Sequence, residues 1–416
     1  MSNAASVAGE AWFKDPALGR IFALLNRDGG EVRVVGGAVR NALMGLPVTD
    51  TDLATTWAPE EVMARAEAEG IRAVPTGIDH GTVTLVIDGR GFEVTTLRHD
   101  AETDGRRAKV VFGSDWQTDA ERRDFTINAL YADASGAIID LVGGLEDIAS
   151  RTVRFIGDPD DRIAEDHLRI LRYFRFFAHY GAGRPDAAAL KACARARDSL
   201  VKLSAERVWK ELKTLLKARD PGRALLWMRQ AGILSLVVPE SEKWGIDSIG
   251  GLIATETALG WEPDPLLRLM AIVPPDVERM REMSSRLKLS RADTERLVKW
   301  AGAPAIAPTL AITALDRLLY RHGAQPLIDR IRLSLVSVRS RTDTDASALT
   351  EAAGHSRHLV RATDWTRPRF PVTGSDLVAK GIEPGPAMGA RLSALEERWI
   401  DSNFSLDKEA LLNAAE

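Results

Sequence analysis

A glycine pair followed closely by two aspartates is the feature that most constrains this chain. The apolar residues 32–35 predict a strand that enters a turn at Gly36 and Gly37, and residues 38–44 predict a short helix. Adjacent glycines at a strand-to-helix junction let backbone N–H groups approach a ligand closely, and a helix N-terminus favours phosphate. Residues 34–53 therefore begin with a predicted anion-binding turn.

Two carboxylates follow this turn within a second predicted strand, residues 49–53. Side chains alternate along a strand, so Asp50 and Asp52 are predicted to point to one side. Neighbouring carboxylates repel unless a cation lies between them, and hard oxygen ligands suit Mg²⁺. Arg40, in the first turn of the preceding helix, is expected to reach the same anion as the glycines. The combination predicts a metal–triphosphate site, and the alternative is a surface turn followed by two solvated aspartates.

The bulk composition is that of an ordinary globular chain. Its 416 residues suggest about two to four domains. A single cysteine, Cys193, excludes an internal disulfide and a cysteine-based zinc site, and favours a reducing compartment. We find no signal peptide at the N-terminus and no apolar stretch approaching about 18 residues, the length that indicates a membrane span. A cytoplasmic protein without membrane segments is expected.

Charge is distributed unevenly along the chain. The net charge is −4, yet residues 151–240 hold 18 Arg and Lys against 11 Asp and Glu. A local basic face of this kind can contact nucleic-acid phosphates. The alternative is a set of helices whose arginines are simply solvated.

A small mixed sheet with helices is predicted for the N-terminal part. Alternating apolar and polar side chains predict three consecutive strands, at residues 71–75, 81–88 and 91–97. Amphipathic spacing predicts helices at residues 16–26 and 58–70. Helices mixed with hairpin strands indicate an α+β head rather than a doubly wound sheet.

The third of these strands and the segment after it bear on the site. Glu93 is either an outward-facing strand residue or a third acidic group beside Asp50 and Asp52 on an adjacent strand. Residues 98–117 are polar and charged without a clear period, and they predict a long mobile loop. Loops of that length in a compact domain are often functional.

Residues 120–130 carry polar groups among apolar ones. Asp124 and Asn128 are four residues apart, and so share one face if this segment is helical. A carboxylate or amide there can accept a hydrogen bond from a ribose hydroxyl, and Arg123 can pair with a triphosphate. The alternative is a helix-capping aspartate beside a solvated arginine.

Residues 163–177 predict a helix with one polar stripe. Asp166, Arg169 and Arg172 recur every three residues, and Arg175 extends the stripe. A carboxylate accepts and a guanidinium donates, which matches the amino donor and ring-nitrogen acceptor that cytosine and adenine both present. Uracil and guanine reverse this pattern and would leave buried polar groups unpaired. The alternative is an ordinary surface ion pair.

These motifs resemble one known family. GGAVR followed by DTDLATTWAPEEV, together with RRDFTINAL and EDHLRILRYFRF, is similar to the motifs of class II CCA-adding nucleotidyltransferases and bacterial poly(A) polymerases. Asn41 stands where that family usually has aspartate, and its amide can still form local hydrogen bonds. The resemblance implies template-independent addition of C, C and A to tRNA 3′ ends from CTP and ATP, with release of pyrophosphate.

The resemblance also implies residue roles. The expected catalytic residues are two Mg²⁺ ligands and a third acidic group, namely Asp50, Asp52 and Glu93. The expected nucleotide-binding residues contact triphosphate, ribose or base, or align the base readers, and are Gly36, Gly37, Arg40, Arg123, Asp124, Asn128, Asp166, Arg169, Arg172 and Arg175.

The family architecture implies four parts. These are a nucleotidyltransferase head at residues 1–148 and an all-α neck, body and tail at residues 149–218, 219–330 and 331–416. The helical parts are expected to bind the tRNA acceptor arm, and no obligatory protein partner is evident. Alternatives are a poly(A) polymerase, an enzyme restricted to CC or A addition, and a non-catalytic RNA-binding protein that retains the fold.

Overall fold

The computed structural model describes residues 5–104, 107–242, 245–341 and 345–413, and the chain divides into two compact units. The first comprises Met1–Leu203 with Gln230–Ile233, and the second Ser204–Arg229 with Leu234–Glu416. The finer boundaries between head, neck, body and tail stay predictions.

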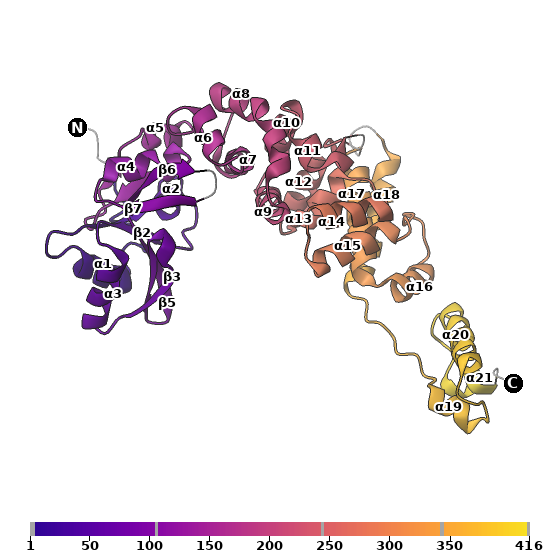
Figure 1. Cartoon of the computed structure of the whole chain (residues 1–416). Helices are drawn as coiled ribbons and strands as arrows, with labels where there is room; N and C mark the ends of the chain where they lie inside the picture. Colours follow the sequence, from indigo (N-terminus) through magenta and orange to yellow (C-terminus); the bar gives the residue numbers. More distant parts are fainter. Residues whose placement is uncertain (1–4, 105–106, 243–244, 342–344, 414–416) are drawn as a thin grey trace. The chain divides into compact units, whose positions relative to one another are not determined.

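A seven-stranded mixed sheet lies in the first unit (Figure 1). Its strands follow the spatial order β3 (Arg72–Gly77), β4 (Thr82–Ile87), β5 (Arg90–Thr96), β2 (Asp52–Thr55), β1 (Val32–Val35), β8 (Leu130–Ala132) and β9 (Ile138–Asp140). Strands β2 and β5 run parallel, whereas the other neighbouring pairs run antiparallel. The mixed sheet confirms the predicted α+β head.

The helices of this unit begin where the sequence offers caps. Asp15 accepts a hydrogen bond from the Ala17 N–H at the start of the first helix, and Pro59 opens the third. The helices are α1 (Pro16–Leu25), α2 (Gly37–Leu43), α3 (Pro59–Ala68), α4 (Trp116–Glu121), α5 (Gly144–Ala149), α6 (Pro159–Glu165), α7 (Arg169–Tyr180) and α8 (Ala187–Arg195). Short 3₁₀ turns are η1 (Ile78–His80), η2 (Thr126–Asn128) and η3 (Arg197–Lys202).

The core of the head occupies both faces of the sheet. Val35, Ala54 and Tyr131 gather with Ala120 of α4 and with Ala129, which follows the η2 turn, in one buried cluster. Side chains alternate along strands, so Val34 and Leu53, which are also buried, point to the opposite face. With both faces covered, β1 and β2 are held firmly where they meet the glycine turn and the aspartates.

Two predictions for the secondary structure of the head were wrong. Two paired strands, β6 (Arg98–Asp104) and β7 (Arg107–Phe112), take the place of the predicted long loop, because backbone pairing forms without an apolar period in the sequence. The second strand begins at Asp52, so Asp50 lies in the segment before it rather than on the strand.

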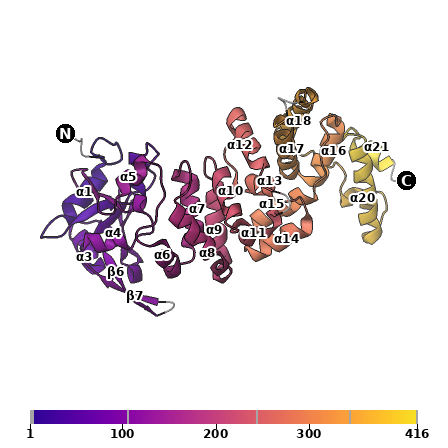
Figure 2. The same ribbon diagram turned by 90° about the horizontal axis from the view of Figure 1, so that it is seen from above.

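The described residues of the second unit form helices and turns without strands, which confirms the predicted all-α region. The helices are α9 (Ala205–Leu216), α10 (Gly222–Gln230, whose last residue belongs to the first unit), α11 (Leu234–Val237), α12 (Ser248–Leu259), α13 (Pro265–Ile272), α14 (Val277–Arg286), α15 (Arg291–Gly302), α16 (Ile312–His322), α17 (Ala324–Arg339), α18 (Ser347–Thr363), α19 (Gly374–Ala379), α20 (Pro386–Asp401) and α21 (Lys408–Asn413), with a 3₁₀ turn η4 (Pro239–Ser241). Helices α17 and α18 lie side by side (Figure 2). Among the described residues, no helix combines the length and the apolar character needed to cross a bilayer.

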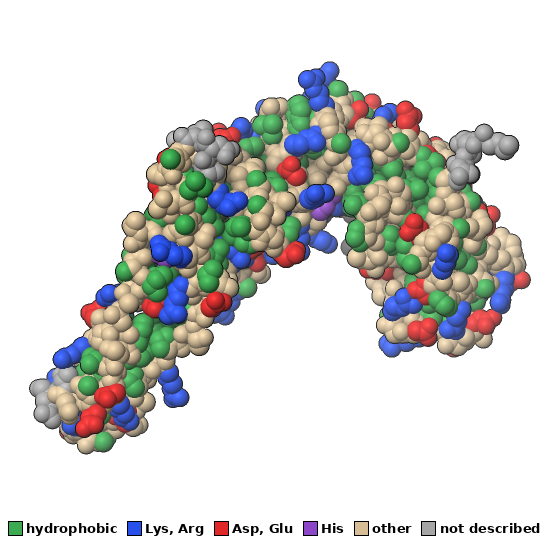
Figure 3. Space-filling model, turned by 180° about the vertical axis from the view of Figure 1, so that it is seen from behind, with side chains coloured by type: hydrophobic (Ala, Val, Ile, Leu, Met, Phe, Trp, Pro, Cys, Tyr) green, Lys and Arg blue, Asp and Glu red, His purple; other side chains and the backbone are tan. Residues whose placement is uncertain are grey.

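The surface carries charges of both signs. In the view of Figure 3, Lys and Arg side chains occupy scattered positions with Asp and Glu between them. Several arginines of the basic stretch at residues 151–240 are held in ion pairs, including Arg172 with Asp124 and Arg195 with Asp160. Neighbouring carboxylates therefore neutralise part of the surplus positive charge in this stretch.

Candidate nucleotide-binding site

Strand pairing brings two predicted acidic residues together. In the parallel pair of β2 and β5, Leu53 lies opposite Val94. Asp52 and Glu93, each one residue earlier on its strand, therefore lie opposite each other as well. Leu53 and Val94 are buried, whereas Asp52 and Glu93 are exposed on the other side of the sheet. The prediction that Glu93 lies on a strand adjacent to that of Asp52 is confirmed, and a role of Glu93 in catalysis stays a prediction.

The acidic groups interact electrostatically. Partial loss of hydration raises the pKa of Asp52, and the negative charges of Glu93 and Asp50 raise it further, although Arg123 opposes them. Closely placed carboxylates form an oxygen donor set that suits a hard divalent cation. In the part of the chain that the structure describes, no group of three or more His, Cys, Asp or Glu is arranged as a complete metal site. The role of Asp50 and Asp52 as metal ligands stays a prediction.

The glycine turn lies beside these carboxylates. Val35 pairs with Asp52 across the antiparallel β1–β2 ladder, and Gly36 is the next residue along the chain. Gly36 has φ of 69°, a conformation that glycine adopts without strain. A Cβ atom at this position would lie 3.4 Å from the Asn128 carbonyl oxygen and 3.8 Å from Nη1 of Arg123. The turn is therefore flanked by the Arg123 guanidinium.

Arg123 is fixed by a buried carboxylate that sequence analysis did not identify. Nε and Nη2 of Arg123 donate to Oδ2 of Asp119 at 3.1 and 3.0 Å, and the Tyr131 hydroxyl donates to the same oxygen at 2.8 Å. Burial favours the neutral acid, but Arg123 and Arg122 outweigh it and hold the pKa of Asp119 below its ordinary value. The available signal was the spacing of four residues between Asp119, in α4, and Arg123, just after the end of this helix. Nη1 of Arg123 remains directed to the glycine turn.

Arg40 is buried rather than open to an anion. Its guanidinium donates to Oδ1 of Asn41 through Nε and Nη2 at 3.1 and 2.9 Å, to Asn128, and to the Tyr180 hydroxyl at 2.7 Å. The Tyr180 ring also lies against it, with 3.9 Å between the guanidinium carbon and the ring centroid. Burial lowers the pKa of Arg40, which still stays charged at neutral pH. Binding of triphosphate by Arg40 stays a prediction. The hydrogen bonds above indicate that Arg40 holds the side chains of Asn41, Asn128 and Tyr180 in place.

Asp124 and Asn128 meet, although the segment is not one α-helix. Helix α4 ends at Glu121, and Asn128 closes the 3₁₀ turn η2. Nδ2 of Asn128 donates to Oδ1 of Asp124 at 3.0 Å, and Arg172 of α7 donates to Oδ2 of Asp124, with 2.8 Å for its Nε. A continuous polar chain thus links α2, η2 and α7 within the first unit.

The predicted helix around Asp166 is interrupted. Helix α6 ends at Glu165 and α7 begins at Arg169, so Asp166 lies between two helices and not on a continuous stripe. The Asp166 carboxylate accepts a hydrogen bond from the Leu168 N–H at 3.0 Å, which turns the chain into α7. The stripe prediction was wrong because this local bond competes with helical pairing.

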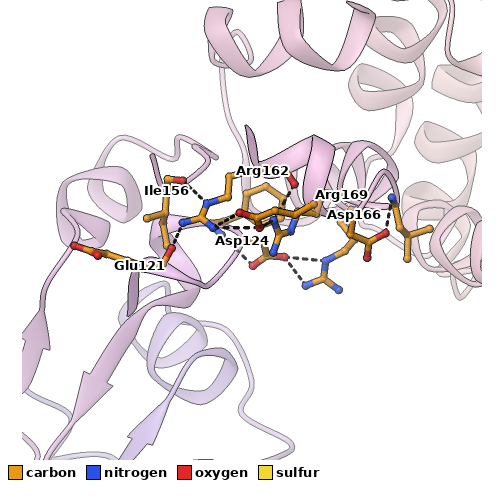
Figure 4. Close-up of polar contacts among 10 residues, drawn as sticks. Glu121, Asp124, Ile156, Arg162, Asp166 and Arg169 are labelled. Carbon is orange, nitrogen blue, oxygen red and sulfur yellow. Dashed lines mark hydrogen bonds and ion pairs between the residues drawn. The ribbon is translucent and has the colours of Figure 1, made fainter. Parts of the chain in front are cut away.

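Arg169 is held by its own neighbours. It donates to the Glu165 carboxylate and, at 2.8 Å, to the Arg162 carbonyl oxygen. Arg162 in turn donates through Nε to the Ile156 carbonyl at 2.8 Å and through Nη2 to that of Glu121 (Figure 4). Arg162 and Glu165 therefore fix the predicted base-recognition segment against the end of α4, a role that the sequence did not reveal.

Arg172 and Arg175 continue along α7, where both lie close to the Phe176 ring. The guanidinium carbon lies 5.6 Å from the ring centroid for Arg172 and 4.5 Å for Arg175. The charge of Arg175 also contributes to the lowered pKa of Arg40, after the larger effect of burial. The two arginines thus border the polar chain described above.

Comparisons with known proteins give matches over nearly the whole chain. Residues 32–154 match the family model described as the Poly A polymerase head domain, and residues 184–244 match that described as a probable RNA and SrmB- binding site of polymerase A. The mitochondrial CCA tRNA nucleotidyltransferase 1 of Danio rerio is 33% identical, over 97% of this chain and 91% of its own length. A CCA-adding enzyme of Lacticaseibacillus paracasei is 32% identical, over 95% and 94%. The structure of the Bacillus stearothermophilus CCA-adding enzyme in complex with CTP is 26% identical, with a TM-score of 0.64 and 92% of both chains covered.

Proposed function

The chain belongs to the family of CCA-adding tRNA nucleotidyltransferases, and we propose that its head adds C, C and A to tRNA 3′ ends from CTP and ATP at the Asp52 site. The observation that carries this proposal is the position of Asp52. Asp52 lies beside Glu93 of the parallel strand β5 and pairs with Val35, the residue before Gly36. The charge of Arg123 also acts on the Asp52 carboxylate.

Asp50 and Asp52 would hold Mg²⁺, because their oxygens suit this cation and their mutual repulsion with Glu93 would be relieved by it. Nucleotidyltransferases of this kind typically depend on a metal. The bound ion would supply Lewis-acid stabilisation of phosphate charge and a lowered pKa for the primer hydroxyl. Glu93 would contribute negative charge that strengthens cation binding.

The triphosphate would lie against the Gly36–Gly37 turn. Nη1 of Arg123 faces this turn, and Asp119 keeps the guanidinium in place. A guanidinium presents paired donors that match phosphate oxygens and offset the charge that develops on the departing pyrophosphate. Arg40 and Asn128 would position the same region through their shared hydrogen bond.

Base recognition is assigned to Asp166 and Arg169. Glu165 and the Arg162 carbonyl hold Arg169, which favours a single orientation of its donors. A fixed donor beside an acceptor selects the edge shared by cytosine and adenine, since uracil and guanine would leave buried groups unpaired. Asp124 and Arg172 would align this segment through their ion pair, with Asp124 also near the ribose.

The helical unit would contact the acceptor arm of tRNA by shape and phosphate charge, in the manner usual for proteins that bind structured RNA. The surplus of Arg and Lys at residues 151–240, which runs from the end of the first unit into the second, supports contact with RNA along the helical part of the chain. The single cysteine is consistent with a cytoplasmic enzyme.

The test is single-nucleotide extension of three tRNA transcripts that end at the discriminator base, at C and at CC. Each is incubated with one labelled NTP and Mg²⁺, with Asp52→Ala as the matched inactive variant. Addition of C, C and then A, followed by a stop, is expected. Unlimited addition of A would instead identify a poly(A) polymerase, and one A on the CC transcript alone an A-adding enzyme. Full turnover by Asp52→Ala would refute the assigned site.

A further inference from the structure

The second unit contains a cavity that none of the nucleotide-site residues lines. Its volume is about 620 Å³, and residues of α12, α13, α15, α17 and α18 surround it. Cavities of about 300–1,000 Å³ are typical of small-molecule sites. The cavity is large enough for an organic molecule.

The walls of the cavity are mixed in character. Met270, Leu333 and Val336 contribute apolar surface, whereas Ser334 and Ser337 of α17 contribute hydroxyl groups. An apolar wall with a few polar groups at one side is the usual composition of a site for a small amphipathic molecule. A purely hydrated or highly charged ligand would fit this wall poorly.

Three lining residues carry buried nitrogen atoms without partners. Trp300 and His355 are only 2% and 3% exposed. Nε1 of Trp300, Nε of Arg330 and Nδ1 of His355 find no hydrogen-bond partner among the described residues. Two of the three are obligate donors, and unmade hydrogen bonds of buried groups cost free energy. These groups favour a ligand that carries acceptor oxygens.

The inner wall carries one persistent positive charge. Nη2 of Arg330 donates to the Ala301 carbonyl at 2.9 Å, and no carboxylate among the described residues forms an ion pair with it. Burial lowers the pKa of Arg330, but an arginine remains charged at neutral pH. Burial and the neighbouring His358 lower the pKa of His355, which is therefore neutral there. Asp247, the acidic residue of the lining, is exposed.

We propose that this cavity binds a small organic carboxylate. The carboxylate oxygens would accept from the Arg330 guanidinium and, after small side-chain rotations, from the Trp300 N–H. The hydrocarbon part would lie against Met270, Leu333 and Val336. The site is separate from the proposed nucleotide chemistry and does not depend on it.

The proposal is tested by isothermal titration of the full chain with three probes that share one hydrocarbon body, namely octanoate, octanol and octylammonium. Octanoate is expected to bind, octanol about tenfold or more weakly, and octylammonium not at all, because only the anion meets Arg330. Equal binding of all three probes, or no octanoate binding at about 10 mM, overturns the proposal.

Variants locate the binding. Arg330→Met is expected to weaken octanoate about tenfold or more while leaving octanol unchanged. Arg332→Met is the matched control, because Arg332 lies on the same helix and also has a buried Nε without a partner among the described residues, yet does not line the cavity. If Arg330→Met fails to fold, Ser337→Trp gives the second test, since an indole at this exposed lining position should block the cavity. Unchanged octanoate affinity in Arg330→Met or Ser337→Trp contradicts the assignment.

Discussion

At the scale of single residues, Asp52 serves the proposed chemistry at a cost to the fold. Reduced hydration and the charges of Glu93 and Asp50 raise its pKa. The folded protein therefore binds this proton more tightly than the unfolded chain does, and ionisation of Asp52 destabilises the fold. The penalty grows as pH rises from the ordinary value of 3.8 through the raised pKa, and it is largest above that pKa.

Asp52→Asn is expected to lower nucleotide incorporation by about 100-fold or more, since the loss of a metal ligand removes several kcal/mol of transition-state stabilisation. The same variant should melt at a slightly higher temperature than the parent at pH 7. This difference should shrink as pH falls through the Asp52 pKa. Extension assays and thermal melts at several pH values measure both effects. Asp88→Asn, in an exposed turn, is the control, and a lower melting temperature of Asp52→Asn at pH 7 would contradict the argument.

Asn41 has two partners, which explains why an amide functions where the family usually has aspartate. Its Oδ1 accepts from Arg40, and its Nδ2 donates to the Pro47 carbonyl at 2.9 Å. Asn41→Asp would strengthen the first contact but set a carboxylate against a carbonyl oxygen. We expect this change to alter the free energy of unfolding by less than about 1 kcal/mol, whereas Asn41→Ala should cost about 1–3 kcal/mol. Denaturant unfolding compares the two, and equal losses would refute the dual role.

At the scale of elements, the junction between α6 and α7 determines the conformation of the proposed base-recognition segment. Arg169 is held by Glu165, and the sequence between the helices is turned by Asp166. Glu165→Gln should let the Arg169 side chain adopt more orientations. Discrimination of CTP and ATP against UTP and GTP should then fall by about tenfold in kcat/KM, and Arg169→Ala should reduce this discrimination further.

Extension assays with each NTP measure this discrimination. Arg195→Met, which removes an exposed ion pair with Asp160 on the neighbouring helix α8, is the control and should leave it unchanged. Equal discrimination in the parent and Arg169→Ala would mean that another residue recognises the base.

At the scale of the whole molecule, a buried ion pair stabilises the second unit. Arg268 and Glu256 are 1% and 4% exposed and 2.7 Å apart. Arg268 also donates to the carbonyls of Leu216 and Ala218 at 2.6 and 2.5 Å, which ties the end of α9 to α12 and α13. Removing one partner of such a pair leaves a buried charge without compensation.

Arg268→Met should therefore cost about 3–5 kcal/mol in the free energy of unfolding, and the double change Arg268→Met with Glu256→Met should cost less. The exposed pair of Arg281 and Glu278 is the control, worth less than about 1 kcal/mol. Denaturant unfolding measures the stability of each variant. CTP binding, which reports on the first unit, should persist in these variants. A double variant less stable than Arg268→Met would contradict the uncompensated-charge argument.

Local sequence determined much of this fold. The strand before Gly36 and the helices α1 and α3 could be predicted, since their apolar periods and caps act over a few neighbouring residues. The spacing of glycines and aspartates indicated metal–triphosphate chemistry for the same reason. The family motifs placed nearly every candidate residue in the first unit.

Only the tertiary structure decided which of these residues meet. Asp52 and Glu93 become neighbours through parallel pairing of β2 and β5, a register that no local pattern encodes. Tyr180 buries Arg40 from a distant helix, and the bond from Leu168 to Asp166 ends a helix that periodicity predicted to continue. Periodicity depends on neighbours along the chain, whereas partners and burial depend on contacts between residues that folding brings together.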